Sequence, residues 1–439
     1  MKIKKLALGE IGFVLFLFCF IFAPPLIPKI NLIFFVFIYA VFQLLRRKKT
    51  LVTNVFYYSG IQKFCTLMFI AYVYIIFIMS IGILFEDVGS INYIKTLYRF
   101  ILLIPITVTC IVYLIVRIHE LKYDVYDVLH AIIKAGMIQV ILSILMFLIP
   151  SVKEFIVNIM FANTGDNLTQ NLWVYQRRLY GFSNSLLDSF GYGTGVIAAL
   201  PLILAARSKI RYLLYIPFLL IVPFLNSRTG LIIFIVGLIC CIPLYAKKLK
   251  LSSMFKLSIL TLLNILFLSV GYKILKIINP ITSEWIGNGL LSVVSMFNTN
   301  NEYNSNIGYT ESTNKLFSAE FWYVPDSIWG FLFGTGHNVY EAIGFTHSDV
   351  GYINDLWLGG VLGLVLFYCP LLSLFIGILI KEKQLGIKYL VCFLGLAFLV
   401  TNIKGYMINY NVGMAVTLAI CFSIVYLNNK NNIPLIKKE

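Results

Sequence analysis

Residues 354–380 read NDLWLGGVLGLVLFYCPLLSLFIGILI, an apolar run that carries one charged residue, Asp355, near its start. A helix of about 20 apolar residues crosses a hydrocarbon core of roughly 30 Å, because all of its backbone hydrogen bonds are internal. Over the whole chain 60% of the residues are hydrophobic and 12% are charged, too few charges to cover a water-soluble surface. The run is therefore predicted to be one membrane-spanning helix among several.

Similar apolar runs recur along the chain and predict an all-α polytopic membrane protein with about 12 transmembrane helices, forming a single transmembrane domain over residues 1–439. The first run follows lysines, as in a signal peptide. Glu10 interrupts that run and no A-x-A cleavage site follows, so a spanning helix is expected there. The predicted spans are 6–23, 28–45, 64–85, 97–117, 131–150, 187–206, 212–226, 229–246, 255–275, 354–380, 388–403 and 408–427.

The net charge of +16 arises largely from basic residues in short connectors, namely 46–49, 207–211, 247–250, 381–388 and 437–438. Short basic connectors are typical of the cytoplasmic side of a membrane protein. These connectors alternate onto one side of the predicted spans, and the even number of spans places both termini on that side. The positive charge therefore indicates orientation in the membrane, and no nucleic-acid partner is expected.

Two connectors on the opposite face are long, 151–186 and 276–353, and are expected to be extracytoplasmic loops. All five tryptophans lie in these loops or at their ends. A flat indole ring suits the apolar face of a sugar, and Trp322 is the candidate for that contact; interfacial anchoring and loop packing are the alternatives. In the first loop, the sequence FIVNIMF at Phe155–Phe161 predicts a short amphipathic helix lying on the membrane.

Two stretches on this outer face carry arginines: QRRLYGFSN at 176–184 and NSRTG at 226–230. An arginine at the outer end of a helix opposes the charge rule, and it costs about 3 kcal/mol if it enters hydrocarbon. One interpretation of Arg228 is a structural arginine whose charge reaches the membrane interface. Guanidinium groups also bind phosphate oxygens in a fixed fork, so Arg228 with Arg178 and Arg177 is a candidate pyrophosphate clamp, and the adjacent Tyr180 a candidate substrate contact.

The segment from Gly334 to Asp355 supplies the candidate base. His347 and Asp349 stand just ahead of a predicted helix. Either they are a solvated loop histidine and a helix-capping aspartate, or His347 deprotonates a hydroxyl while the carboxylate tunes it. His337 is a weaker candidate for substrate binding. Gly334 and Gly336 predict a sharp turn or a close approach of the backbone to a ligand.

Metal and nucleotide signatures are missing from the sequence. It has no Asp-x-Asp at a helix start, no His-x-x-x-His, no P-loop and no dinucleotide fingerprint. All eight cysteines fall in or beside apolar runs, which predicts neither a disulfide nor a thiolate metal site. We therefore expect no metal and no cofactor.

Taken in order, RRLYGFSN, SRTG at the head of a helix and FGTG…HSDxGYINDLWLGGVLGLVLF resemble the bacterial O-antigen and capsular polysaccharide polymerases (Wzy-type) and the related O-antigen ligases. The resemblance covers roughly residues 170–370 and rests on the order and spacing of short motifs. It implies a multi-pass enzyme of the bacterial cytoplasmic (inner) membrane with two large outer loops.

The resemblance also implies roles for particular residues. Arg178 and Arg228 would hold the pyrophosphate of a polyprenyl-linked glycan, and His347 would activate the acceptor hydroxyl. Asp349 would orient His347. Alternatively, Glu341 would act as the base in place of His347. The implied activity is a metal-independent glycosyltransferase that joins polyprenyl-pyrophosphate-linked oligosaccharide repeat units. Its expected partners are that lipid-linked glycan, membrane lipid, and chain-length regulator and flippase proteins.

Two departures from the family patterns leave polymerase and ligase both open. The ligase pattern places a glycine where Leu358 stands after His347-Ser348, and the spaced Arg…Gly pattern of some polymerases is missing after Arg177 and Arg178. A flippase or transporter of lipid-linked glycans is the alternative from another class. Such a protein needs polar residues at mid-membrane, and the sequence offers few of them: Glu10, Gln139 and Asn264.

Overall fold

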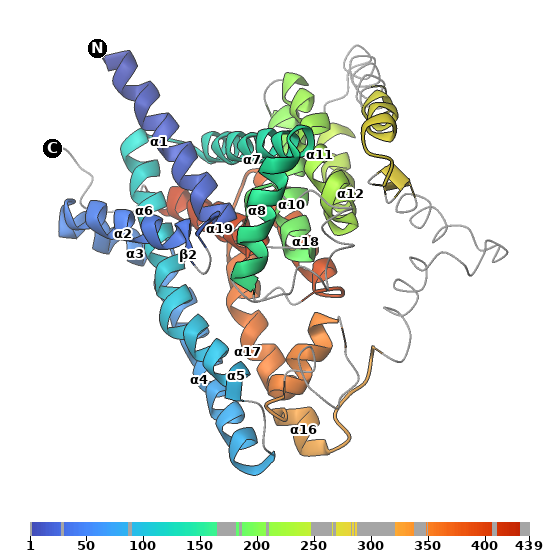
Figure 1. Cartoon of the computed structure of the whole chain (residues 1–439). Helices are drawn as coiled ribbons and strands as arrows, with labels where there is room; N and C mark the ends of the chain where they lie inside the picture. The colour runs from blue at the N-terminus through green and yellow to red at the C-terminus, as the bar shows by residue number, and fades with distance from the viewer. Residues whose placement is uncertain are drawn as a thin grey trace. The chain divides into compact units, whose positions relative to one another are not determined.

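The computed structural model describes residues 2–27, 30–86, 90–164, 181–183, 187–207, 210–246, 266, 269–281, 283–284, 286–287, 321–337, 348, 350–405 and 411–430. Nearly every element within these residues is a helix (Figure 1). The exception is a small antiparallel pair of strands, β1 (Pro25–Ile27) and β2 (Ile30–Asn31). The chain divides into two compact units: unit 1 is Met1–Phe13, Phe34–Val128 and Lys315–Glu439, and unit 2 is Val14–Ile33 and Leu129–Asn314.

Six helices in the described part of the chain are long and apolar enough to cross a membrane: Ile61–Leu84, Tyr93–Leu121, Val125–Leu148, Ser189–Arg207, Gly351–Lys381 and Val412–Asn429. Shorter apolar helices occupy Gly9–Phe22, Leu32–Leu45, Ile210–Asn226, Thr229–Tyr245 and Leu385–Thr401. The protein is thus an all-α membrane protein. These helices overlap every predicted span except 255–275, most of which lies outside the described residues. The total of twelve spans and the sidedness of the loops stay predictions.

Unit 1 is built from α3 (Lys49–Tyr58), α4 (Ile61–Glu86), α5 (Ser90–Tyr98), the π-helical turn η1 (Arg99–Leu103), α6 (Ile104–Leu121), α16 (Ile328–Phe333), α17 (Gly351–Lys381), α18 (Leu385–Thr401) and α19 (Val412–Asn429). The helix α6 ends where Lys122 adopts a left-handed φ of 58°. There the Tyr123 amide donates to the Ile118 carbonyl at 3.1 Å, which satisfies an acceptor at the helix end.

The core of unit 1 lies where α4, α6, α17 and α19 meet, and α19 is buried along nearly all of its length. Aromatic rings make the contacts there. The rings of Phe64 and Phe422 meet edge to face with centroids 5.4 Å apart, and those of Tyr72 and Phe367 do so at 5.9 Å. Edge-to-face pairs are a preferred aromatic geometry and fix the rotation of one helix against the next.

Unit 2 is built from α8 (Pro150–Thr164), α10 (Leu187–Arg207), the 3₁₀ turn η2 (Ile210–Tyr215), α11 (Ile216–Asn226) and α12 (Arg228–Ala246), with the strands. Three helices have residues in both units: α1 (Lys2–Phe22), α2 (Leu32–Leu45) and α7 (Val125–Leu148). The helix α8 contains the segment Phe155–Phe161, for which the sequence predicts a helix. Ile156, Val157 and Met160 of α8 are buried, whereas Phe155 is 63% exposed.

Candidate functional site

The structure describes some of the predicted site residues and not others. His347, Asp349, Arg177, Arg178, Tyr180 and Glu341 lie outside the described residues. Arg228 is the first residue of α12, as the sequence predicts. The structure describes its backbone and not its side chain. His337 and Trp322 lie in the described segment 321–337. The site is therefore built from the backbone and side chains that flank the predicted residues.

In unit 2, the described part of the RRLYGFSN motif is Gly181–Ser183, and it is fixed at both ends. Gly181 has a φ of +64°, and a Cβ there would lie 2.8 Å from the Ser143 Oγ atom of α7. Ser183 is fully buried and donates its hydroxyl to the Phe22 carbonyl of α1 at 3.1 Å. Only glycine combines that φ with so close an approach. Gly181 therefore fixes the path of the backbone that follows Arg177 and Arg178 in the sequence.

The NSRTG motif packs on a glycine seam in α10. Gly191 and Gly195 have the Gly-x-x-x-Gly spacing, which brings two helix backbones together. A Cβ on Gly195 would lie 2.9 Å from the Gly230 Cα atom, and one on Gly191 would lie 2.7 Å from the Ser227 Oγ atom. Ser227 and Thr229 are buried on either side of Arg228. The seam therefore fixes the backbone on which Arg228 stands.

The two arginine-bearing motifs meet at one apolar cluster in unit 2. Phe182, just after the arginine pair in sequence, and Leu225, just before Arg228, both pack in it. The cluster's other buried members are Met146, Ile156, Val157, Met160, Leu275 and Ile286. The structure thus brings together the backbone that follows Arg178 and the backbone that precedes Arg228.

In unit 1, the FGTG segment docks on a break in α17. The helix is interrupted at Gly360, whose φ of 66° and ψ of −170° are open essentially to glycine alone. The carbonyl groups before the break lose their partners in the helix. Thr335 instead donates to the Trp357 carbonyl through its amide at 2.8 Å and its hydroxyl at 3.0 Å, and the Gly336 amide donates to the Leu358 carbonyl at 3.2 Å.

Tyr74 of α4 completes this junction. Its hydroxyl lies 2.7 Å from the Phe333 carbonyl oxygen and 3.0 Å from the Gly359 carbonyl oxygen, so it can donate to either. Gly334 and Gly336 have φ values of 89° and 76°, which confirms the predicted turn. A Cβ on Gly334 would lie 2.6 Å from the Gly359 Cα atom, so the backbone that Gly334 approaches is that of α17. Irregular backbone is tolerated at membrane depth only where the protein satisfies it in this way.

The start of α17 is held by buried polar groups. Ser348 is fully buried and donates to the Phe321 carbonyl at 2.8 Å, and its Oγ accepts from the Val350 amide at 3.2 Å. Asn354 donates to the Ser348 carbonyl at 2.9 Å, and the Gly351 amide donates to the Asn402 carbonyl at 3.0 Å. These bonds fix both chain neighbours of Asp349, and Ser348 directly follows His347.

Asp355 is a candidate site residue that the sequence motifs do not identify. It is fully buried in α17, and one carboxylate oxygen accepts from the Tyr368 hydroxyl at 3.0 Å. The Tyr368 ring stacks on Tyr352 with centroids 5.6 Å apart. A buried ionisable residue in a membrane helix is a functional candidate in general. The signal available in the sequence was the polar pair Asn354-Asp355 at the head of an apolar run.

Aromatic side chains surround the same junction. Trp357 donates its indole N–H to the Tyr323 carbonyl at 3.1 Å, and the two rings meet at 5.5 Å. Burial raises the pKa of Tyr323, which keeps its phenol protonated. Trp322 is 42% exposed, and Trp329 of α16 is 74% exposed with its ring stacked on Phe333. Exposed indole faces are therefore available next to the FGTG segment, as a sugar platform or an interfacial anchor requires.

His337 is half-buried, and its backbone amide donates to the Thr335 Oγ atom at 3.3 Å. Within the part of the chain that the structure describes, no three His, Cys, Asp or Glu side chains are grouped to hold a metal ion. The expectation that the reaction needs neither metal nor cofactor stays a prediction.

Comparison with protein-family models, with curated proteins and with solved structures finds no match to this chain.

Proposed function

We propose that this chain is a polysaccharide polymerase that joins polyprenyl-pyrophosphate-linked oligosaccharide repeat units on the outer face of the bacterial cytoplasmic membrane. The product is an O-antigen or a capsular or exopolysaccharide. The proposal rests on the motif order in the sequence and on one structural observation. Phe182 and Leu225 pack in a single apolar cluster, which brings together the chain that follows Arg178 and the chain that precedes Arg228.

The reaction that this proposal assigns forms one glycosidic bond. A hydroxyl at the non-reducing end of a new repeat unit attacks the anomeric carbon of the growing glycan. The bond from that carbon to the pyrophosphate oxygen breaks, and polyprenyl pyrophosphate leaves. Arg178 and Arg228, with Arg177, stabilise the negative charge that develops on the leaving group. His347, oriented by Asp349, accepts the proton of that hydroxyl. For this its imidazole nitrogen must lie within about 2.6–3.2 Å of the hydroxyl oxygen.

The two halves of this assignment have different structural support. For the arginines, the glycine contacts of Gly181 and of Gly191, Gly195 and Gly230 fix the backbone next to the motifs. For His347, support comes from its chain neighbour Ser348, which is buried and bonded on the Phe321 carbonyl. A catalytic group must be held close to its working geometry, and rigid neighbouring backbone meets that requirement. Trp322 and Tyr180 are the proposed sugar contacts, with His337 as a further polar contact.

The test is a reaction of the purified full-length protein with a polyprenyl-pyrophosphate-linked repeat unit, followed by sizing of the glycan. We expect a ladder of polymer from the wild type. Arg228→Ala and His347→Ala should each reduce polymer by at least about 100-fold, since lost charge stabilisation or lost acid–base catalysis has effects of this order. Arg211→Ala is the matched control, because Arg211 is an exposed arginine of unit 2 outside the motifs, and it should polymerise normally.

Three other outcomes would contradict the proposal. Polymer from both Arg228→Ala and His347→Ala at the wild-type level would refute the assigned residues. Transfer of the glycan only to a different acceptor, without a ladder, would identify a ligase. Movement of the lipid-linked glycan across a vesicle membrane, without new glycosidic bonds, would identify a flippase.

A further inference from the structure

Unit 1 contains a pocket where the start of α4 meets the C-terminal ends of α17 and α19. Its volume is about 150 Å³. Two lysines and two asparagines line it together with apolar side chains of the three helices. None of its lining residues belongs to the sequence motifs to which the proposed reaction is assigned.

The polar side chains of this pocket lie at the ends of candidate membrane spans. Lys381 and Asn429 are the last residues of two spans, and Lys63 is the third residue of another. The apolar lining lies deeper: Leu374 stands seven residues before Lys381 on α17, which is about 10 Å at 1.5 Å per residue. The charged part of the pocket is therefore at the depth of lipid headgroups, and its floor is at the depth of hydrocarbon.

The two lysines have no counter-charge in the described part of the chain. Neither Lys63 nor Lys381 pairs with a carboxylate there. The neighbouring Glu382 is already occupied: it accepts from two backbone amides of the following connector, at 2.8 and 2.7 Å, and from the Asn428 side chain at 2.9 Å. Lys63 also stands in the first turn of α4, where the helix dipole disfavours a cation and no acidic residue balances it. A pocket lined by two such cations favours an anionic ligand.

The two asparagines add hydrogen-bond acceptors. The Asn428 side-chain amide donates to Glu382, and that of Asn429 donates to the Tyr58 carbonyl at 2.9 Å. Within the described residues, neither side-chain oxygen accepts a hydrogen bond. Amide oxygens accept from hydroxyl groups. The pocket therefore suits an anion that also carries hydroxyls.

The size of the pocket suits a headgroup and not an acyl chain. Gly377 provides the room, because nothing lies within 4 Å of a Cβ built on it. A volume of about 150 Å³ is the space of about five water molecules at about 30 Å³ each. An extended acyl chain needs far more than this.

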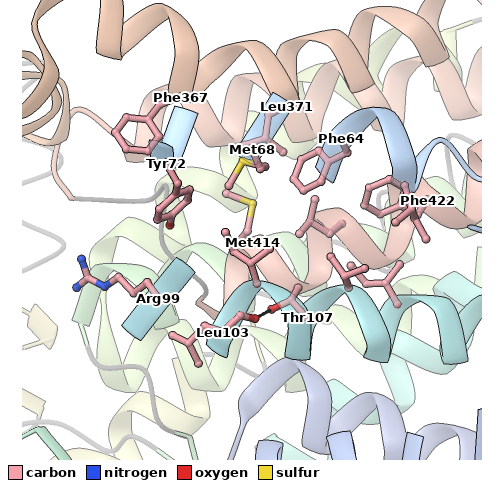
Figure 2. Close-up of a pocket in the computed structure, with 15 residues that line it drawn as sticks. Phe64, Met68, Tyr72, Arg99, Leu103, Thr107, Phe367, Leu371, Met414 and Phe422 are labelled. Carbon is pink, nitrogen blue, oxygen red and sulfur yellow. Dashed lines mark hydrogen bonds between the residues drawn. The ribbon is translucent and has the colours of Figure 1, made fainter. Parts of the chain in front are cut away.

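The acyl chains of such a ligand have to lie outside the pocket. At its inner wall the Phe64 ring meets Phe422 edge to face at 5.4 Å (Figure 2). Phe64 also lines a narrower cavity of about 50 Å³, which continues along α4 to Tyr72 and is too small for a chain (Figure 2). On the neighbouring face of α17, Ile376 and Ile380 are 53% and 76% exposed and offer an apolar surface to the membrane.

We propose that this pocket binds the headgroup of an anionic glycerophospholipid of the phosphatidylglycerol class. The phosphate pairs with Lys63 and Lys381, the headgroup hydroxyls donate to Asn428 and Asn429, and the acyl chains lie along the exposed face of α17. Basic pockets between membrane helices hold anionic headgroups at the cytoplasmic surface, and the basic connector 381–388 is predicted to lie on that side. The inference does not rest on the proposed polymerase activity.

Native mass spectrometry of the purified full-length chain tests this proposal. The probes are phosphatidylglycerol, phosphatidylcholine with the same acyl chains, a polyprenyl phosphate and inorganic phosphate, each alone and in competition with phosphatidylglycerol. Lys63→Met combined with Lys381→Met removes both charges. Gly377→Leu fills the pocket without changing a charge. Lys383→Met is the matched control, because Lys383 is an exposed lysine of the same connector that does not line the pocket.

We expect the wild type and Lys383→Met to retain phosphatidylglycerol in preference to the other three probes. A lysine near an anionic headgroup contributes about fivefold, so the double variant should retain phosphatidylglycerol about 25-fold less. Gly377→Leu should lower its retention by at least about tenfold, because the added side chain occupies the space of the headgroup. A double variant that is not monodisperse is replaced by Lys63→Gln with Lys381→Gln, which should show the same loss.

Four results would overturn the proposal. The first is equal retention of the two phospholipids by the wild type. The second is unchanged retention of phosphatidylglycerol by the double variant or by Gly377→Leu. The third is a loss in Lys383→Met as large as in the double variant, because the attraction then belongs to the whole basic surface. The fourth is displacement of phosphatidylglycerol by an equal concentration of inorganic phosphate or polyprenyl phosphate, because the occupant is then a free anion or the glycan carrier.

Discussion

Replacing Gly360 by alanine should destabilise unit 1, because this position of α17 combines a positive φ with close contact to another stretch of backbone. Gly360 has a φ of 66° and a ψ of −170°, and an L-residue held there costs about 1–3 kcal/mol. The added Cβ would lie 2.5 Å from both the carbonyl carbon and the carbonyl oxygen of Leu332. Backbone atoms cannot move aside as a side chain can, so α16 and the FGTG segment would have to shift.

That shift has a second cost. The carbonyl groups of Trp357, Leu358 and Gly359 accept from Thr335, Gly336 and Tyr74 across the break. Each buried carbonyl left without a donor costs about 1–3 kcal/mol. Strain and lost hydrogen bonds together give about 3 kcal/mol or more for Gly360→Ala. We expect the thermal transition of the purified protein to fall by several degrees, measured by size-exclusion chromatography after heating.

Gly377→Ala is the matched control for this experiment. Gly377 lies in the same helix, and nothing is within 4 Å of a Cβ built on it. Alanine is favoured over glycine in a helix by about 0.5–1 kcal/mol, so Gly377→Ala should be neutral or slightly stabilising. If Gly360→Ala is as stable as Gly377→Ala, the FGTG segment does not depend on the break in α17, and the account of this junction is wrong.

Three further predictions concern stability. Tyr74→Phe removes the hydroxyl near the Phe333 and Gly359 carbonyls and should lower the free energy of unfolding by about 1 kcal/mol. Tyr57→Phe, at a side chain 55% exposed, should leave it unchanged. Equal thermal transitions for the two variants would contradict this. Gly195→Ala places a methyl group against the Gly230 backbone and should lower the free energy of unfolding by about 1–3 kcal/mol. The control Gly12→Ala has nothing within 4 Å of the added Cβ and should leave stability unchanged. A Gly195→Ala protein as stable as the wild type would show that the glycine seam does not fix the NSRTG backbone. Burial lowers the pKa of Lys153, because the folded state disfavours the charged ammonium form. At neutral pH the charged Lys153 therefore destabilises the folded state. This destabilisation decreases as the pH rises through the lowered pKa. Lys153→Met should therefore raise the thermal transition at pH 7 and raise it less near pH 10.4, about the usual lysine pKa, and a gain that does not change with pH would contradict the assignment.

The sequence predicts the helices well because apolar length alone decides them. The run 354–380 becomes α17, which extends only a few residues beyond it, and α12 begins at Arg228, as expected from SRTG. The break at Gly360 was not predicted. Hydropathy reads the same through Gly359-Gly360 as through the rest of the run, and the break depends on Tyr74 and residues 333–336, far away in sequence.

The candidate site was predicted in part. Gly334 and Gly336 predict a sharp turn or a close approach of the backbone to a ligand, and their positive φ values fit the turn. The partner of that turn is the α17 backbone, which no local pattern in the sequence identifies. In the sequence Asp355 stands at the start of a predicted span, whereas in the structure it is fully buried and accepts from the Tyr368 hydroxyl, a contact that the sequence does not indicate. The roles of Arg178, Arg228 and His347 stay predictions.

The central claim is that this chain makes new glycosidic bonds between lipid-linked repeat units. The most direct measurement is the length of the glycan after the purified protein is incubated with a polyprenyl-pyrophosphate-linked repeat unit alone. We expect a ladder of multiples of the repeat unit, present with Arg211→Ala and lost with Arg228→Ala. A wild-type product that stays at a single repeat unit, from protein that is folded and monodisperse, would contradict it.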